Sequence, residues 1–246
     1  MKYVIVLGDG MAGEPLEELQ QKTTLEAART PRMDALAPKS EQGIARMVPV
    51  GMAPGSDTAN LAVAGYDPRK YYTGRSPLEA LSIGVDMEPD DVAFRCNLVT
   101  LSEEDTEYEN RTILDHSSDE ISTADAAILL EAVKEGLKKE GFEFYVGTSY
   151  RHLLIWKQGR VVELTPPHDV LTRKIGLNPA NSAWFWGAGT RPALTSFEGK
   201  TGKKGVMISA VDLLKGIAVG AGMDRVIVEG ANGGLNTNYV GKAQAA

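Results

Sequence analysis

Short apolar runs that end at glycine, proline or serine organise the first part of the chain. Residues 3–7 are a continuous apolar run closed by Gly8-Asp9-Gly10, which predicts a buried strand of a parallel sheet. Residues 43–50 predict a second strand. Residues 57–64 predict a helix that the chain enters through Pro54-Gly55-Ser56.

Two further predicted helices begin with a hydroxyl residue followed by proline. Thr30-Pro31 opens a helix over residues 31–37, and Ser76-Pro77 opens another that begins with residues 76–81. Ser and Thr are preferred helix caps, and proline is favoured in the first turn because its missing N–H would be unpaired there. Residues 1–91 therefore have an α/β pattern.

The pattern changes from about residue 92 to a mixture of strands and one amphipathic helix. The predicted elements are a strand at 93–101, a helix at 122–139 capped by Ser122, a strand at 144–146, and a hairpin of residues 150–156 and 159–164. We expect residues 92–191 to form a smaller α+β domain inserted into an α/β core.

The α/β pattern returns after this block. The predicted elements are a strand at 206–210, a helix at 211–221 and a strand at 225–228. The predicted core therefore consists of residues 1–91 and 192–246, interrupted by the insertion. Residues 241–246 look like the first turns of a helix without a C-terminal signal. We expect a chain cut short at this point, with a frayed tail as the alternative.

The composition is that of an ordinary soluble globular protein. The 246 residues are 43% hydrophobic and 24% charged, and the formal net charge is −7. This charge disfavours nucleic acid and anionic membranes as partners, although a local Arg/Lys pocket can still bind a small anion. Cys96 is the single cysteine, and no apolar run is long enough for a signal sequence or a membrane span. We therefore expect a cytoplasmic protein.

The spacing of Gly8-Asp9-Gly10 and Gly13 matches the dinucleotide-binding fingerprint. That fingerprint needs a helix that begins in the loop and an acid about 20 residues later. Pro15 interrupts an early helix, and the second strand ends at Gly51 without an acid, so a nicotinamide-dependent oxidoreductase is the weaker interpretation. Asp9, at the carboxyl end of a strand, also suits a divalent cation or a simple Asp-Gly turn.

Ser56 stands at the expected start of a helix. It can cap that helix, but a helix N-terminus is also an anion site, because its free N–H groups and dipole favour a phosphoryl group nearby. A serine hydroxyl is a weak nucleophile on its own, and a bound metal ion is the natural group to stabilise its alkoxide. Asp9 and Ser56 each follow a predicted strand, which makes them candidates to share such a metal.

Cationic and imidazole side chains form two further sets of candidates for binding an anion. The loop of residues 65–77 contains Arg75 among three cations and three tyrosines, and Arg has the better geometry for phosphate or carboxylate. The insertion contains all three histidines, and Lys215 lies on the later helix. Each of these residues can also be an ordinary solvated side chain. The candidates in the insertion are Asp115, His116, Arg151, His152, His168, Asp169 and Arg191.

Segments along nearly the whole chain resemble the archaeal-type, cofactor-independent phosphoglycerate mutases of the alkaline phosphatase superfamily. The specific feature is the ordered combination of Gly8-Asp9-Gly10, Pro54-Gly55-Ser56-Asp57 and Tyr71-Tyr72-Thr73-Gly74-Arg75. Further matching stretches are TPRMDALA, YRHLLIW, TPPHD, NPANSAWFWGAGTRPAL, ISAVDLLKGIAVGAGM and EGANGGLNTNYVGKAQAA. The resemblance implies an alkaline-phosphatase-like core sheet with helices on both faces, interrupted by the smaller α+β domain.

The resemblance also implies a chemistry. Members of the family interconvert 3-phosphoglycerate and 2-phosphoglycerate through a phosphoserine, with two divalent metal ions (manganese, magnesium or zinc) and without 2,3-bisphosphoglycerate. It implies that Ser56 carries the phosphoryl group and that Asp9 and Ser56 ligate one metal. The substrate-binding residues that it implies are Arg75, Arg151, His152, His168, Asp169, Arg191 and Lys215. Asp115-His116 departs from the family pattern.

A second departure concerns the remaining metal ligands. The family uses an Asp and two His for one metal and an Asp-His pair for the other, and residues 1–246 contain no Asp-x-x-x-His and no Asp-His pair in the predicted core. We therefore expect a fragment with a half-built metal site and no mutase turnover of its own. The alternatives are a related phosphotransferase or phosphatase, similar to proteins proposed as homoserine kinases, and a non-catalytic module that binds phosphorylated small molecules. A homo-oligomer is compatible with all of them.

Overall fold

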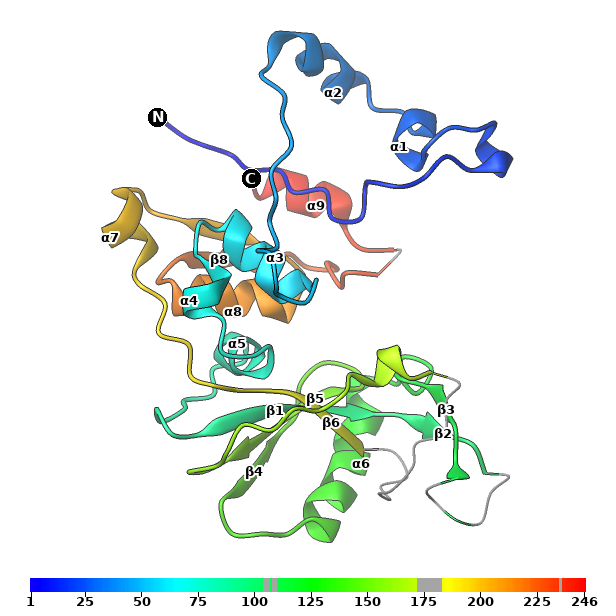
Figure 1. Ribbon diagram of the computed structural model, residues 1–246, viewed down its shortest axis with the longest axis vertical. Coiled ribbons are helices and arrows are strands. Elements are labelled where there is room, and N and C mark those ends of the chain that lie inside the picture. Colours follow the sequence, from blue (N-terminus) through cyan, green and yellow to red (C-terminus); the bar gives the residue numbers. More distant parts are fainter. Residues whose placement is uncertain (104–106, 108–109, 172–182, 235) are drawn as a thin grey trace. The chain divides into compact units, whose positions relative to one another are not determined.

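The structure is a computed structural model that describes residues 1–103, 107, 110–171, 183–234 and 236–246 (Figure 1). Contacts divide the described chain into two compact units. The first contains Met1–Arg46 and Ala246, and the second contains Met47–Ala245.

The first unit consists of short helical segments joined by extended chain. Its elements are η1 (Glu17–Leu19), α1 (Thr24–Ala27), α2 (Pro31–Leu36) and η2 (Ala37–Lys39). At the start of α1, the Thr23 hydroxyl accepts the Glu26 N–H at 3.2 Å and the Glu26 carboxylate accepts the Thr23 N–H at 2.8 Å, which is a reciprocal capping box. The helix expected after Thr30 is α2, but the Thr30 hydroxyl donates to Asp34 instead of capping a backbone N–H.

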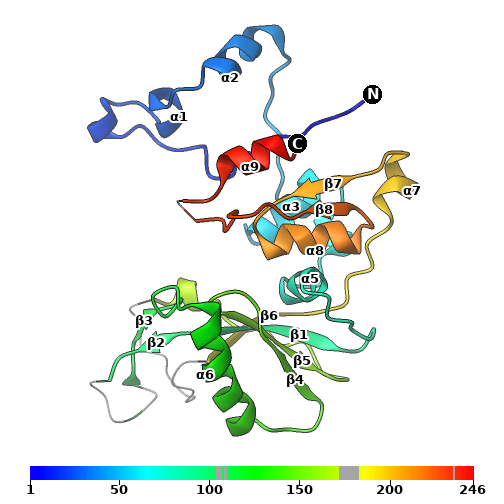
Figure 2. The same cartoon turned by 180° about the vertical axis from the view of Figure 1, so that it is seen from behind.

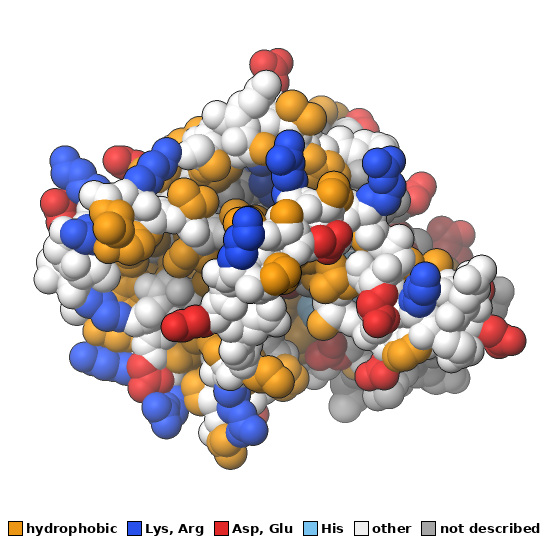
Figure 3. All heavy atoms as spheres, turned by 90° about the horizontal axis from the view of Figure 1, so that it is seen from above, with side chains coloured by type: hydrophobic (Ala, Val, Ile, Leu, Met, Phe, Trp, Pro, Cys, Tyr) orange, Lys and Arg blue, Asp and Glu red, His pale blue; other side chains and the backbone are white. Residues whose placement is uncertain are grey.

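The strands expected at residues 3–7 and 43–50 are wrong. Neither segment is a strand, and most of their side chains are exposed; Val6 and Ile44 are 90% and 105% exposed. An apolar run becomes a buried parallel strand only when other strands pair with it and helices cover both faces, and no described residue forms a β-pair with either segment. Figure 3 shows exposed hydrophobic side chains between charged ones on the face that it draws.

The second unit contains an antiparallel sheet with the strand order β4-β5-β1-β6. Its strands are β1 (Val92–Leu98), β4 (Phe142–Tyr145), β5 (Arg151–Trp156) and β6 (Ala183–Thr190). A separate short pair consists of β2 (Thr100–Leu101) and β3 (Ile113–Asp115). The strands predicted near 93–101, 144–146 and 150–156 are therefore confirmed. The predicted hairpin is wrong, because β1 and β4 pair with the two edges of β5 and leave none for residues 159–164.

β1 is buried along its whole length, and its alternation separates an apolar from a partly polar face. Cys96 and Leu98 pack against Leu130 and Ala126 of α6 (Thr123–Gly136), which Ser122 caps as predicted. Ala93 and Arg95 face the other way, toward α5 (Ser76–Ser82): Ala93 packs with Ala80, and Arg95 forms an ion pair with Glu79. Figures 1 and 2 show α6 on one face of the sheet and α5 on the other.

A small α/β group of the second unit packs around α8. It contains α3 (Ser56–Val63), α4 (Pro68–Tyr71), α7 (Phe197–Thr201), β7 (Val206–Ile208), α8 (Asp212–Gly220) and β8 (Asp224–Val226). The two remaining elements are η4 (Pro167–Asp169), whose His168 packs against Trp186 of β6, and α9 (Tyr239–Gln244). β7 and β8 are parallel and α8 connects them, as the sequence predicts. Leu61 of α3, Leu78 of α5 and Ile217 of α8 share one buried cluster. The coarse prediction of a mixed α/β protein is thus confirmed.

The fold bears on two questions about the class of protein: whether it has a membrane-spanning helix and whether it has a dinucleotide-binding unit. Among the residues that the structure describes, no helix has the length and apolar character needed to cross a membrane. The glycines at positions 8, 10 and 13 neither follow a strand nor open a helix. The dinucleotide-binding interpretation therefore lacks the strand–turn–helix unit on which it depends.

Candidate active site

Ser56 is the first residue of α3, and its side chain is exposed. Gly55, not Ser56, occupies the N-cap position, so the predicted capping role of Ser56 is wrong. A Cβ on Gly55 would lie 2.3 Å from Asp57 Oδ1, so glycine lets that carboxylate lie close to the N-cap. The Ser56 hydroxyl is therefore not used to cap its own helix.

The Asp57 carboxylate holds the turn that carries Ser56. Its Oδ1 accepts the Thr58 N–H at 2.9 Å, and its Oδ2 accepts the Tyr72 hydroxyl at 2.6 Å. Burial and the neighbouring Asp57 carboxylate raise the pKa of Tyr72 well above its ordinary value, so the phenol stays protonated and donates. The first turn of α3 is thereby tied to the segment that follows α4.

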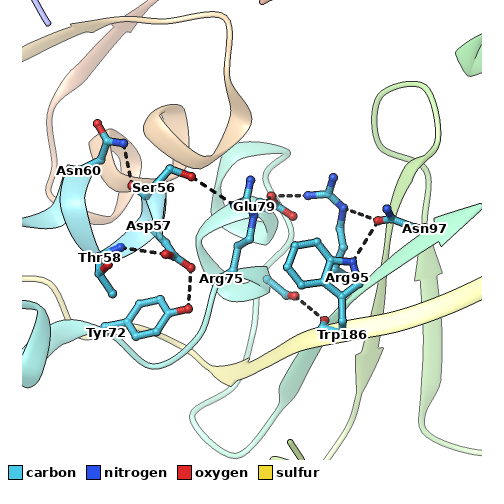
Figure 4. A network of polar contacts seen from close by, with 11 residues as sticks. Ser56, Asp57, Thr58, Asn60, Tyr72, Arg75, Glu79, Arg95, Asn97 and Trp186 are labelled. Carbon is cyan, nitrogen blue, oxygen red and sulfur yellow. Dashed lines mark hydrogen bonds and ion pairs between the residues drawn. The ribbon is translucent and has the colours of Figure 1, made fainter. Parts of the chain in front are cut away.

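Arg75 approaches Ser56 from the end of that segment, immediately before α5 (Figure 4). Its Nη1 donates to Ser56 Oγ at 3.4 Å, and its Nε donates to Glu79 Oε1 at 2.9 Å. Gly74 makes this path possible: its φ is +139°, and a Cβ there would lie 2.3 Å from the carbonyl oxygen of Ala188 on β6. The structure thus brings two of the predicted site residues, Ser56 and Arg75, together.

Glu79 connects Arg75 to Arg95 on the adjacent face of β1. Both guanidiniums donate to Glu79 Oε1, and the side chains of Glu79 and Arg95 are 8% and 5% exposed. Burial alone would raise the pKa of the Glu79 carboxyl, but the nearby charges of Arg95 and Arg75 lower it below its ordinary value. The carboxylate is consequently ionised at neutral pH.

A second layer of contacts surrounds Arg95. Its Nε donates to Asn97 Oδ1 at 3.0 Å, and the Trp186 indole N–H donates to the same oxygen at 3.2 Å. The His168 ring packs edge-on against Trp186, with 5.3 Å between the ring centroids, and lies 6.1 Å from the His116 ring. Burial, with the charges of His116 and the arginines, lowers the pKa of His168 although Asp169 acts in the opposite direction.

His152 lies beneath this cluster on β5 and is 1% exposed. Its Nδ1 accepts the Gly147 N–H at 3.3 Å, and its Nε2 has no hydrogen-bond partner among the described residues. It lines a cavity of about 20 Å³, which Glu79, Arg95 and Asp212 also line. Such a volume has room for one water molecule. Burial and the charge of Arg95 lower the pKa of His152 to about 4.

The other predicted substrate-binding residues have individual local partners. Arg151 stacks over the Tyr150 ring at 4.4 Å from its centroid. Asp169 lies 3.7 Å from His168. Arg191 donates to the Met87 carbonyl at 3.0 Å. Lys215 pairs with Asp212 at 3.2 Å. Asp115 accepts hydrogen bonds from Ser117 and Asp119 within its own turn. Burial alone would raise the pKa of Asp115, but these hydrogen bonds lower it below its ordinary value.

Asp9 belongs to the first unit, where it is exposed in the turn at Gly10. Its predicted role as a metal ligand shared with Ser56 stays a prediction. Within the described chain, no group of three or more His, Cys, Asp or Glu side chains is arranged to hold a metal ion.

The buried residues that support Ser56 and Arg75 were not predicted from the sequence. Two signals were available. Arg75 and Glu79 are four positions apart on a predicted helix start, the spacing of an ion pair. Arg95 and Asn97 alternate with apolar residues in the strand VAFRCNL, which places them on one face of it. Tyr72 and Trp186 had no comparable signal, because aromatic residues at such positions are common in cores.

Comparisons with known proteins give consistent matches. The family model described as "2,3-bisphosphoglycerate-independent phosphoglycerate mutase" matches residues 37–183. The protein of that name from Methanosarcina acetivorans is 44% identical over 284 aligned residues, which cover 100% of this chain and 70% of the relative. A probable 2,3-bisphosphoglycerate-independent phosphoglycerate mutase from Geobacter sulfurreducens is 45% identical with the same coverage.

Two solved structures resemble the fold. A protein from Pyrococcus horikoshii aligns with a TM-score of 0.73 and 28% identity, over 97% of this chain and 64% of that one. The cofactor-independent phosphoglycerate mutase from Thermoplasma acidophilum aligns with a TM-score of 0.51 and 26% identity, over 96% of this chain and 71% of that one. This chain thus spans about two thirds of the length of the proteins that it matches.

Proposed function

Because the chain belongs to the family of 2,3-bisphosphoglycerate-independent phosphoglycerate mutases, we propose that its residues serve the interconversion of 3-phosphoglycerate and 2-phosphoglycerate, with Ser56 as the phosphoryl carrier. The enzymes of this family are isomerases, and the reaction is a step of glycolysis and gluconeogenesis. The observation that carries the proposal is the position of Ser56 at the start of α3, with the Arg75 guanidinium within reach of its hydroxyl.

The reaction consists of two phosphoryl transfers on one serine. In the first, Ser56 Oγ loses its proton and bonds to phosphorus, while the bond between phosphorus and the C3 oxygen of the substrate breaks and that oxygen takes up a proton. In the second, the C2 oxygen loses its proton and bonds to the phosphorus of phosphoserine, while the bond between phosphorus and Ser56 Oγ breaks and that oxygen is protonated again. No co-substrate is consumed, since the phosphoryl group only moves between two oxygens of one molecule.

The surroundings of Ser56 suit the charge of a transferring phosphoryl group. The dipole of α3 favours an anion at its first turn, where the N–H of Thr58 is already accepted by Asp57 but the helix start still points toward Ser56. Arg75 adds a cationic fork, whose planar N–H groups match phosphate oxygens. In the transition state of phosphoryl transfer, the charge is spread over the equatorial oxygens of the phosphoryl group. Hydrogen-bond donors placed around these oxygens therefore lower the free-energy barrier of the transfer.

Divalent metal ions are part of the proposed chemistry. Asp9 and Ser56 are the residues that would hold one of the two ions, and both side chains are exposed, so their oxygens are accessible. A carboxylate and an alkoxide are oxygen donors suited to Mn²⁺ or Mg²⁺, and Zn²⁺ also accepts them. When bound, such an ion stabilises the serine alkoxide at neutral pH.

The inserted domain is part of the proposal too. We assign an alkaline-phosphatase-like core with helices on both faces to residues 1–91 and 192–246, and a substrate-clamping domain to residues 92–191. In support, β1, β4, β5, β6 and α6 all fall within the second range. The residues assigned to the substrate are Arg75, Arg151, His152, His168, Asp169, Arg191 and Lys215. His168 has the strongest support, since it contacts Trp186, whose ring also lies under Arg75.

The proposed setting of the enzyme is the cytoplasm, with phosphoglycerate as its small anionic partner. The net charge of −7 supports the exclusion of nucleic acid and anionic membranes as main partners. The substrate must therefore be attracted by local cations such as Arg75, not by the field of the whole protein.

The experiment is a turnover assay on two proteins. One is the 246-residue chain, and the other is a chimera in which this chain replaces the matched part of the Methanosarcina acetivorans relative. Phosphorus NMR follows 3-phosphoglycerate and 2-phosphoglycerate directly in the presence of Mn²⁺. We expect the chimera to convert one into the other, and EDTA to abolish the conversion. The 246-residue chain, which contains no Asp-x-x-x-His and no Asp-His pair in its predicted core, should show no turnover.

The variants identify the carrier. Ser56→Ala should lower kcat of the chimera by a factor of about 10⁴ or more, because the nucleophile itself is lost. Ser40→Ala, at an exposed serine of the first unit, is the matched control and should keep wild-type kcat. Full turnover by Ser56→Ala would refute the proposal. Phosphorylation of homoserine by ATP, in place of mutase turnover, would favour a related phosphotransferase.

A further inference from the structure

Glu79 is a buried carboxylate that two arginines share. Its Oε1 accepts the Nε–H of Arg75 at 2.9 Å and a terminal N–H of Arg95. The Arg75 side chain is 23% exposed, whereas the other two side chains are almost completely buried. The three residues form a chain of ion pairs that runs from β1 to Ser56 (Figure 4).

The orientation of Arg75 depends on Glu79 more than on Ser56. The bond from Arg75 to Ser56 Oγ is 3.4 Å long and joins a neutral hydroxyl, which makes it weak. The bond to Glu79 is 2.9 Å long and charge-assisted. Because the guanidinium is rigid and planar, a fixed Nε also fixes the direction of the terminal nitrogens. Glu79 therefore directs Nη1 of Arg75 toward the serine.

Arg95 fixes Glu79 in turn. Asn97 Oδ1 accepts both the Arg95 Nε–H and the Trp186 indole N–H, and Asn97 Nδ2 donates to the His116 carbonyl at 3.1 Å. The guanidiniums of Arg75 and Arg95 each lie 5.6 Å from the centroid of the Trp186 ring. A buried network with these mutually supporting contacts holds its members in one arrangement.

We propose that Glu79 is a positioning residue for phosphoryl transfer at Ser56: it holds the Arg75 guanidinium in the orientation that meets the phosphoryl oxygens, and Arg95 anchors Glu79 to β1. This proposal rests on the proposed function, because it takes Ser56 as the phosphoryl carrier. A guanidinium that is 1 Å out of place would still bind an anion, but it would stabilise the transferring group less well.

The first test is Glu79→Gln in the chimera, because glutamine keeps the size of the side chain and removes its charge. We expect kcat to fall about a hundredfold with KM little changed, since the arginine remains present but is no longer aligned. Glu131→Gln is the matched control. Glu131 lies on α6, its side chain is 64% exposed and it pairs with Lys134 at 2.6 Å, so both constants should stay at wild-type values.

A second test uses the 246-residue chain and needs no turnover. Nitrogen–proton NMR resolves arginine Nε–H signals, and the Arg75 signal is identified by its disappearance in Arg75→Lys. In the wild type the Arg75 Nε–H should exchange slowly with water, because Glu79 accepts it. In Glu79→Gln the exchange should become at least about ten times faster, the factor that corresponds to losing a charge-assisted bond of about 1.5 kcal/mol.

Further variants keep the proposal testable if Glu79→Gln does not fold. Arg95→Lys leaves the Glu79 charge in place but removes the guanidinium fork, and it should also speed exchange at Arg75 and lower kcat. Wild-type exchange at Arg75 together with wild-type kcat, in whichever of these variants folds, would overturn the positioning role. Turnover by Ser56→Ala would instead refute the proposed function, and the NMR result would still decide how Arg75 is held.

Discussion

The buried imidazole of His152 makes the folded protein sensitive to acid. Burial and the charge of Arg95 lower its pKa from an ordinary 6.5 to about 4 in the folded state, and the residue is 1% exposed. The His152 imidazole therefore binds a proton near pH 6.5 in the unfolded chain, but only near pH 4 in the folded chain. Stability is complete above pH 6.5 and is lost as the pH falls through this window.

The size of the effect follows from these two pKa values. Across the whole window the loss approaches about 3.4 kcal/mol, at about 1.36 kcal/mol for each pKa unit. Between pH 7.5 and pH 5.0 the same two values give about 2 kcal/mol. A domain of this kind has a total stability of about 5–15 kcal/mol, so this loss is large enough to measure.

Urea unfolding at pH 7.5 and pH 5.0 measures this loss of stability. Wild type should lose about 2 kcal/mol more between the two pH values than His152→Gln, because glutamine does not titrate and the other titrating groups are common to both proteins. Ile155→Val, at another buried position on β5, is the matched control. It should lower stability by about 0.5–1.5 kcal/mol at both pH values and keep the wild-type difference between them.

The reasoning would be refuted if wild type and His152→Gln lost the same free energy of unfolding between pH 7.5 and 5.0. Equal losses would mean that the imidazole takes up its proton without opening the fold. A solvent-filled path to the cavity beside His152 would then have to exist.

Two other changes test the packing around the site. Gly216→Ala should destabilise the protein by about 1–3 kcal/mol in urea unfolding, because the new Cβ would lie 1.7 Å from the carbonyl oxygen of Leu78. The control Gly136→Ala, with no atom near its Cβ, should be neutral or stabilising.

Tyr72→Phe should lower stability by about 1.5–3 kcal/mol and slow phosphorylation of Ser56, because Asp57 loses the hydroxyl that it accepts at 2.6 Å. Thermal unfolding and a phosphoserine assay measure these two effects. An unchanged melting temperature would contradict the prediction.

Elements determined by local sequence could be predicted. Ser122 caps α6 because its hydroxyl accepts the N–H of Asp125, which follows it in the first turn of the helix, and no distant residue is needed. β1 and α8 were likewise visible as apolar patterns of the right period and length. Their bounds differ by a few residues from the prediction, as helix and strand ends generally do.

Elements that depend on distant partners were predicted less well. Residues 159–164 have strand-like composition, but both edges of β5 are already paired with β1 and β4. The run at residues 3–7 is apolar enough for a strand, yet in the first unit nothing pairs with it. Composition describes what a segment can do, whereas pairing is decided by other parts of the chain.

The candidate site divides in the same way. Ser56 and Arg75 could be selected from local motifs, and the structure brings them within 3.4 Å. The support from Glu79, Arg95 and Trp186 depends on α5 packing on the sheet, which brings residues from three elements together. Such a network cannot be derived from spacing along the chain, since its members are up to 111 positions apart between Arg75 and Trp186.

The central claim is that Ser56 carries the phosphoryl group, and a trapped intermediate tests it most directly. The chimera is mixed with 3-phosphoglycerate and Mn²⁺, quenched in acid within the first turnovers and digested, and the peptides are analysed by mass spectrometry. The account predicts one phosphoryl group on Ser56, which appears only when metal and substrate are both present. Turnover with a phosphoryl group on another residue, or with none on Ser56 at any quench time, would contradict it.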